Sequence, residues 1–172
     1  TFSLKDALKK GPVVVYFYPP AYTGGCNVQA RTFAQNIDKF SAAKATVIGV
    51  SLDDIDTLNQ FSADPEYCGG KVPVASDKDG KIAKSYDIKV FDAKAGMKNT
   101  KGNEINHGFA ERTTFVITQD GKVAATVGGM GATAPAGAAM GIAYATSYFA
   151  VVVACPSALL AVAIDVALQK LP

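Results

Sequence analysis

The sequence predicts an α/β sandwich, in which a mixed central sheet carries helices on both faces. Short apolar, β-branched runs alternate along the chain with segments whose apolar residues recur at helical spacing. The last two predicted strands follow one another across a turn instead of a helix, which indicates an antiparallel pair in the sheet. A length of 172 residues suits one domain with a substantial core.

The first half of the chain alternates strand and helix. Val13–Phe17 is continuously β-branched or aromatic, which is typical of a buried strand. The apolar spacing of Phe33, Ile37 and Phe40 indicates that a helix follows. The other elements expected here are a helical turn at Leu4–Lys9, a strand at Lys44–Val50 and a helix that Asp53 or Asp54 caps and that runs to about Phe61.

The second half is predicted to begin with an edge strand, or the start of a strand, at Val72–Val74, because Pro73 cannot donate to a sheet ladder. A short helix at Lys81–Tyr86 should turn Ile82 and Tyr86 toward the core. A long surface loop follows from Lys89 to Gly108. The last expected element of the domain is an antiparallel hairpin, formed by Thr113–Ile117, a turn at Gln119–Gly121 and Lys122–Val127.

The C-terminal tail differs in composition from the rest of the chain. We expect a domain over residues 1–127 and a tail over 128–172, whose final helix packs on the same domain. No charged residue stands between Lys122 and Asp165. After a Gly-rich linker, the run Ala138–Ala154 is apolar or small, and Ser157 should cap a helix to about Gln169. Because a membrane span needs about 20 apolar residues and this run is marginal, we expect burial against the sheet or a partner chain instead of membrane insertion.

Composition excludes several classes of function. The net charge of +2 does not favour a nucleic-acid partner. Three cysteines without regular spacing form no disulfide framework, and no Cys/His cluster has the spacing of zinc ligands. We interpret Asp53, Asp54 and Asp56 as capping and solvated residues, and His107, the single histidine, as a surface or loop-anchoring side chain. We therefore expect neither a metal nor a cofactor. No signal peptide is visible, and a soluble protein is expected, whether cytoplasmic, periplasmic or organellar.

Cys26 is the strongest candidate for a reactive residue. It follows the predicted strand Val13–Phe17 across a turn-rich loop with two prolines and two glycines, and a helix begins there. Unpaired N–H groups and the positive end of the dipole converge in the first turn of a helix. That setting favours a thiolate, which is the nucleophilic form of cysteine.

The loop resembles the Pro-x-x-x-Thr-x-x-Cys motif of the peroxiredoxins at Pro19, Thr23 and Cys26. A second element of that family lies at Glu111–Ile117, where Arg112 opens a late strand. The resemblance covers roughly Leu8 to Val127 and is nearest to the Q-type (bacterioferritin-comigratory) subgroup. It implies a thioredoxin-like fold and a further strand or hairpin before Thr1.

This resemblance also implies a chemistry, the reduction of hydroperoxides by Cys26. Arg112 and Thr23 would stabilise the charge that develops on the leaving oxygen, and Pro19 would shield the site from water. The backbone N–H groups of Gly25 and Cys26 would bind the peroxide. Gln29 stands where relatives often carry a glutamate, and its role stays open.

The sulfenic acid that forms on Cys26 must be resolved, and Cys68 is the candidate that the resemblance favours. An intramolecular Cys26–Cys68 disulfide would be reduced by thioredoxin or a similar dithiol. The alternative is a one-cysteine enzyme. The position five residues after Cys26, which some Q-type relatives use for resolution, holds Arg31, and Cys155 is expected to be a buried thiol. The protein would be a monomer or a homodimer.

Two other functions are compatible with parts of this sequence. A disulfide oxidoreductase of the thioredoxin type needs Cys-x-x-Cys, and the first position of that motif is Thr23 here. A non-enzymatic thioredoxin-fold module, associating through the apolar tail, remains as the alternative from a different class.

Overall fold

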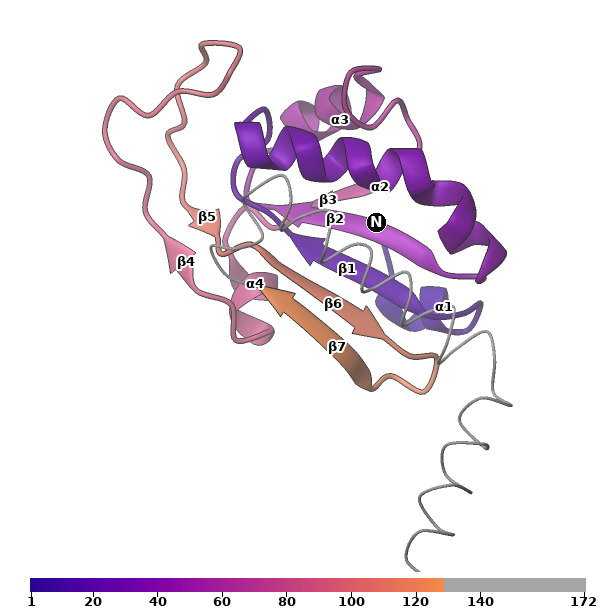
Figure 1. Ribbon diagram of the computed structural model, residues 1–172. Coiled ribbons are helices and arrows are strands. Elements are labelled where there is room, and N and C mark those ends of the chain that lie inside the picture. The colour runs from indigo at the N-terminus through magenta and orange to yellow at the C-terminus, as the bar shows by residue number, and fades with distance from the viewer. Residues whose placement is uncertain (129–172) are drawn as a thin grey trace, which may run out of the picture.

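The computed structural model describes residues 1–128, and these form one layered α/β unit (Figure 1). The elements in chain order are α1 (Leu4–Leu8), β1 (Val13–Phe17), α2 (Gly24–Ala42), β2 (Thr46–Ser51), α3 (Ile55–Ala63), β3 (Val74–Ser76), α4 (Lys81–Ser85), β4 (Val90–Phe91), β5 (Phe109–Ala110), β6 (Thr113–Ile117) and β7 (Val123–Gly128).

The central sheet has five strands in the order β3-β2-β1-β6-β7. Strand β1 pairs in parallel with β2, where Val15 lies opposite Ile48, and antiparallel with β6, where Val15 lies opposite Phe115. The hairpin of β6 and β7 adds a second antiparallel pair. The predicted class, an α/β fold with a mixed central sheet, is therefore confirmed.

Each face of the sheet is covered by a pair of helices (Figure 1). Because side chains alternate along a strand, Val14 and Tyr16 of β1 face α2 and α3, and Val13 and Val15 face α1 and α4. All five side chains of β1 are buried, as predicted for a central strand. The carboxyl end of β1 points at the start of α2, so that this strand and helix hold the loop that carries Cys26.

Several details differ from the sequence-based expectations. Strand β2 begins at Thr46, because Lys44 has a φ of 55° and belongs to the turn before it. The prediction that Ile82 faces the core is wrong, since its side chain is 45% exposed. Helix α4 has only five residues and turns Ala83 inward, and Ile82 lies instead at a surface hollow that Phe2 also lines.

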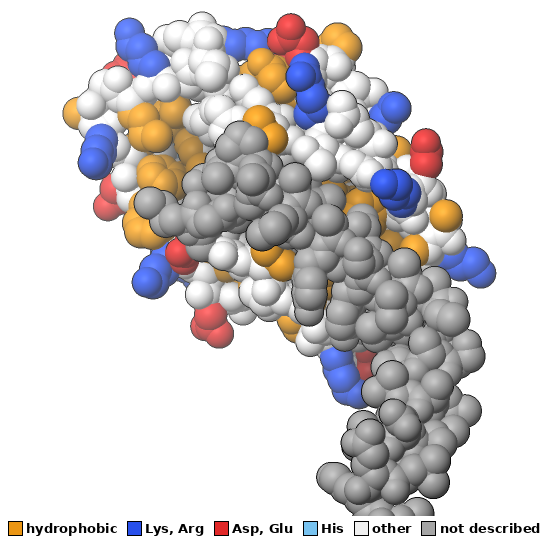
Figure 2. All heavy atoms as spheres, viewed as in Figure 1, with side chains coloured by type: hydrophobic (Ala, Val, Ile, Leu, Met, Phe, Trp, Pro, Cys, Tyr) orange, Lys and Arg blue, Asp and Glu red, His pale blue; other side chains and the backbone are white. Residues whose placement is uncertain are grey.

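The N-cap of α3 is Asp54, whose carboxylate accepts from the N–H of Thr57 at 2.8 Å. Lysine, arginine and acidic side chains are interspersed over the face shown in Figure 2, without a large region of one sign. Within residues 1–128, no helix is both long and apolar enough to cross a membrane. The predictions for the tail, including its final helix and Cys155, fall on residues 129–172 and lie outside the described part of the chain.

Candidate active site

Cys26 lies in the first turn of α2, as the sequence predicts. Thr23 is the N-cap and has an extended backbone, and the N–H of Cys26 donates to its carbonyl oxygen at 2.9 Å. A threonine at this position normally caps the helix with its hydroxyl, but the Thr23 side chain makes no such bond. Its Oγ1 lies 2.8 Å from the Pro20 carbonyl oxygen and 3.1 Å from Cys26 Sγ. The hydroxyl is thus directed toward the sulfur and away from its usual capping role.

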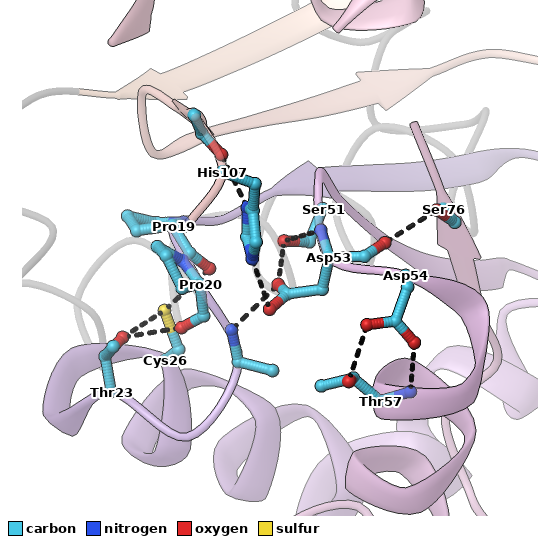
Figure 3. A network of polar contacts seen from close by, with 12 residues as sticks. Pro19, Pro20, Thr23, Cys26, Ser51, Asp53, Asp54, Thr57, Ser76 and His107 are labelled. Atoms are coloured by element: carbon cyan, nitrogen blue, oxygen red, sulfur yellow. Dashed lines mark hydrogen bonds and ion pairs between the residues drawn. The ribbon is translucent and has the colours of Figure 1, made fainter. Parts of the chain in front are cut away.

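The sulfur of Cys26 has polar partners on several sides. Arg112 Nη2 donates to Sγ at 3.1 Å, and the thiol lies 3.3 Å from the Pro19 carbonyl oxygen, to which it can donate (Figure 3 shows the loop contacts). The structure therefore brings together Pro19, Thr23, Cys26 and Arg112, four residues that the sequence analysis named as site residues. Of the two N–H groups expected to bind peroxide, that of Cys26 already donates to Thr23.

Arg112 is buried and is held by Gln29 as well as by the cysteine. Its guanidinium is 86 residues away from Cys26 in sequence, and its Nη1 donates to Gln29 Oε1. Gln29 is itself buried on the inner face of α2. Gln29, whose role the sequence left open, therefore lies where its amide oxygen can orient the guanidinium. Among the described residues, the Nε of Arg112 has no hydrogen-bond partner.

Burial raises the pKa of the Cys26 thiol above its ordinary value. The Arg112 cation and the hydrogen bonds from Thr23 and Arg112 lower that pKa without cancelling the effect of burial. The expectation that the start of the helix favours a thiolate is therefore not borne out in the folded state, because burial, which leaves the side chain only 1% exposed, outweighs the groups that stabilise the charge. Ionisation of Cys26 depends on Arg112 and Thr23 for the same reason.

A second polar cluster lies behind the loop, around Asp53. The interpretation of Asp53 as a capping or solvated residue is wrong, since Asp54 caps α3 and Asp53 is 4% exposed. Its Oδ2 accepts from the N–H of Ala21 at 2.9 Å, and His107 Nε2 lies 3.2 Å from Oδ1 (Figure 3). His107 therefore is a loop-anchoring residue, which was one form of the expected interpretation.

The loop that carries Cys26 is also held at Tyr22, whose φ is 58°. Its carbonyl oxygen accepts from both the N–H and the hydroxyl of Thr100, at 2.8 and 2.6 Å. Lys101 Nζ lies 4.3 Å from the centre of the Tyr22 ring and pairs with Asp64. The contacts of Thr100 and Asp53 could not be found from sequence spacing, because they join residues far apart in the chain.

Cys68 lies in the turn-rich segment after α3, as expected, and it is a free thiol in the same core cluster as Cys26. Burial, with a smaller effect of Asp64, raises its pKa to about 11. Gly69 and Gly70 follow with φ values of 54° and 73°. The segment is closed by backbone bonds, such as that from the Gly70 N–H to the Ser62 carbonyl at 2.7 Å.

Comparisons with known proteins agree with this geometry. Residues 1–126 match the AhpC/TSA family. A putative peroxiredoxin bcp of Helicobacter pylori is 35% identical over 119 residues, which cover 69% of this chain and 70% of that protein. A putative peroxiredoxin of Mycobacterium tuberculosis is 33% identical over 111 residues, which cover 64% of this chain and 64% of that protein.

Solved structures show the same fold. Peroxidoxin BcpB of Mycobacterium tuberculosis superposes with a TM-score of 0.60 at 29% identity, over 79% of this chain and 81% of that one. Peroxiredoxin Q of Xanthomonas campestris gives a TM-score of 0.63 at 28% identity, over 83% and 81%. The fold and the site thus define a peroxiredoxin, a thiol peroxidase of the thioredoxin fold. The chain belongs to the AhpC/TSA family, and its similarity to Bcp and peroxiredoxin Q proteins confirms the Q-type assignment.

Proposed function

We propose that Cys26 is the residue that reduces hydroperoxides, and that Arg112 and Thr23 are its catalytic partners. The observation that carries this proposal is the convergence of Arg112 Nη2 and Thr23 Oγ1 on Cys26 Sγ, each at 3.1 Å. Both partners lower the pKa of a thiol that burial raises. The Arg112 guanidinium, which carries further N–H donors, is also in place for the charge that develops on a departing oxygen.

The reaction begins when the Cys26 thiolate attacks the outer oxygen of a hydroperoxide. A sulfur–oxygen bond forms as the oxygen–oxygen bond breaks, so sulfur is oxidised and the peroxide is reduced. The products are a sulfenic acid, which keeps the hydroperoxide proton, and an alkoxide or hydroxide, which takes a proton from solvent. The buried Nε–H of Arg112, which lacks a partner within residues 1–128, is a donor available to the peroxide oxygens.

Thr23 serves this reaction through the position of its single hydroxyl proton. In the resting site that proton can be donated to Cys26 Sγ at 3.1 Å; when it is donated instead to the Pro20 carbonyl at 2.8 Å, a lone pair of Oγ1 is free to accept from the hydroperoxide. Gly25 is the remaining backbone donor of the two predicted for the peroxide, because the Cys26 N–H is engaged. Pro19 keeps the loop stiff, since its φ is fixed, and its carbonyl accepts from the resting thiol.

The second step is resolution of the sulfenic acid by Cys68. Attack of the Cys68 sulfur forms a Cys26–Cys68 disulfide and releases water, and a dithiol such as thioredoxin would restore both thiols. The raised pKa of Cys68, about 11, means that little thiolate is present in the folded state. The Cys68 segment must therefore open before Cys68 reacts, and the positive-φ glycines after Cys68 mark where the chain can open. A one-cysteine mechanism is the alternative.

Intact mass and free-thiol count after one equivalent of hydrogen peroxide test this proposal. The native protein should lose two thiols without gaining oxygen, and Cys68→Ser should gain one oxygen as a sulfenic acid that a dimedone probe captures. Cys155→Ser is the matched control and should behave as the native protein. A sulfenic acid in native protein and Cys68→Ser alike would establish the one-cysteine mechanism. Unchanged thiols in the native protein would contradict the role of Cys26.

A further inference from the structure

The carboxylate of Asp53 joins three segments of the chain behind the loop Tyr18–Cys26, which we call the catalytic loop. Its Oδ2 accepts from the Ala21 N–H at 2.9 Å and from the Ser51 hydroxyl at 2.5 Å. Its Oδ1 faces His107 Nε2 at 3.2 Å. Ala21 stands between the two prolines and Thr23, so this carboxylate fixes the backbone that presents Pro20 and Thr23 to the cysteine (Figure 3).

The second contact of His107 determines the protonation state that the arrangement requires. His107 Nδ1 lies 2.8 Å from the carbonyl oxygen of Gly108. A carbonyl oxygen and a carboxylate oxygen both only accept, and a neutral imidazole carries one N–H. Both bonds can be made together only when the ring carries a proton on each nitrogen. A neutral His107 must lose either its hydrogen bond to Asp53 or its hydrogen bond to Gly108.

The charges around the ring favour that protonated state. The hydrogen bond to Asp53 is the largest of several effects that raise the pKa of His107 above its ordinary value, and the charge of Asp54 adds to it. Burial opposes them. On the histidine's own loop, a cavity of about 310 Å³ beside it is also lined by Asp92, Lys94 and Glu104. The side chain is 27% exposed, so the ring can exchange protons with solvent.

We propose that Asp53 and His107 are a pair of positioning residues for the catalytic loop, and that protonation of His107 controls how firmly the loop is held. The imidazolium links the Gly108 end of the β4–β5 loop to the carboxylate that holds Ala21. Thr100, midway along the same loop, holds the Tyr22 carbonyl by two further hydrogen bonds. The inference rests on the proposed role of Cys26.

The sign of the pH effect follows from the two bonds. Below the pKa of His107 both bonds form and Thr23 is held against Cys26. As the pH rises through that pKa, one bond is lost and the loop loosens, so each Cys26 thiolate reacts more slowly. Ionisation of the thiol acts in the opposite direction, since it increases the reactive form as the pH rises. The two effects can therefore be separated by comparing variants at the same pH.

The test uses the fact that the sequence holds one histidine. NMR of the ring should give a single titration with a pKa above the ordinary value of about 6.5. In Asp53→Asn that pKa should fall to the ordinary value or below. Asp54→Asn is the matched control, because it removes a neighbouring carboxylate that contacts Thr57 and not the ring. It should lower the histidine pKa much less and leave peroxide reactivity unchanged.

The rate constant for oxidation of Cys26 by hydrogen peroxide is then measured for native protein and His107→Gln across the titration. The ratio of the native to the variant rate constant should exceed one at pH 6, by up to the roughly 10²-fold that a misplaced catalytic group can cost, and should approach one at pH 9. A ratio that does not change with pH would overturn the inference, even if the variant were slower throughout. An Asp53→Asn protein with an unchanged histidine pKa would also overturn it. Failure of native Cys26 to react would instead remove the proposed function on which the inference rests.

Discussion

Cys26 and Cys68 occupy the same core cluster and are equally buried, at 1% exposure each, yet their surroundings differ in kind. Cys26 is at the start of a 19-residue helix and has Arg112 and Thr23 against its sulfur. The effects that shift the pKa of Cys68 are burial and the Asp64 carboxylate, and both raise it. At equal burial, the Cys26 sulfur thus has donors that can stabilise its charge, whereas the Asp64 carboxylate beside Cys68 disfavours a thiolate there.

Replacing Arg112 with methionine should have the largest effect and make the reactivity of Cys26 most similar to that of Cys68. Arg112→Met keeps much of the buried volume but removes the largest effect that lowers the pKa of Cys26, so that pKa should rise further. Oxidation of Cys26 by hydrogen peroxide should slow by about 10²- to 10³-fold at pH 7, the loss expected for one charge-stabilising donor. The rate at which Cys26 is alkylated, measured at a series of pH values, gives the change in its pKa. An unchanged profile would show that Arg112 does not act on the sulfur.

Thr23→Val should have the next largest effect, about 10- to 10²-fold on the same rate constant, as expected for one hydrogen bond to a charged group. Valine has the shape of threonine without the hydroxyl that lies between Pro20 and Cys26. Thr23→Ser restores that hydroxyl and is the matched control, with a rate constant near the native value. Equal losses in the two variants would assign the effect to packing instead of the hydroxyl.

Gly70→Ala tests the Cys68 segment and should have the smallest effect of the three substitutions. The φ of 73° is strained for alanine, and a Cβ there meets nothing within 4 Å, so only the backbone conformation is penalised. The folded form of the Cys68 segment should lose about 1 kcal/mol, and disulfide formation after oxidation should accelerate by about fivefold. Gly121→Ala imposes the same strain in the distant β6–β7 turn, at a φ of 82°, and should leave disulfide formation unchanged. Equal rates in all three proteins would contradict local opening at Cys68.

Local sequence patterns predicted the features that depend on residues close together in the chain. The buried run Val13–Phe17, the break after it and the helical spacing beyond placed Cys26 in the first turn of α2. The motif resemblance supplied Arg112, which composition and periodicity alone could not bring to the cysteine from 86 residues away. The prediction for Ile82 failed because a five-residue helix at the edge of the fold turns Ala83 inward instead.

The supports of the catalytic loop were not predicted for a related reason. Asp53 follows a strand and precedes a helix, where an aspartate usually caps or is solvated, and Asp54 takes the capping role beside it. Its actual partner, the Ala21 N–H, is 32 residues away in sequence. Only the parallel pairing of β1 and β2 brings the ends of those strands together and makes the contact possible.

The measurement that tests the central claim most directly is the rate at which each cysteine is first oxidised in the native protein. Protein treated with substoichiometric hydrogen peroxide is quenched at short times with dimedone and an alkylating reagent, and the labels on Cys26 and Cys68 are quantified by peptide mapping. We predict that the first sulfenic acid forms at Cys26, at least 10²-fold faster than at Cys68. First oxidation at Cys68, or comparable rates at the two residues, would contradict the account that the donors around Cys26 make it the peroxide-reducing residue.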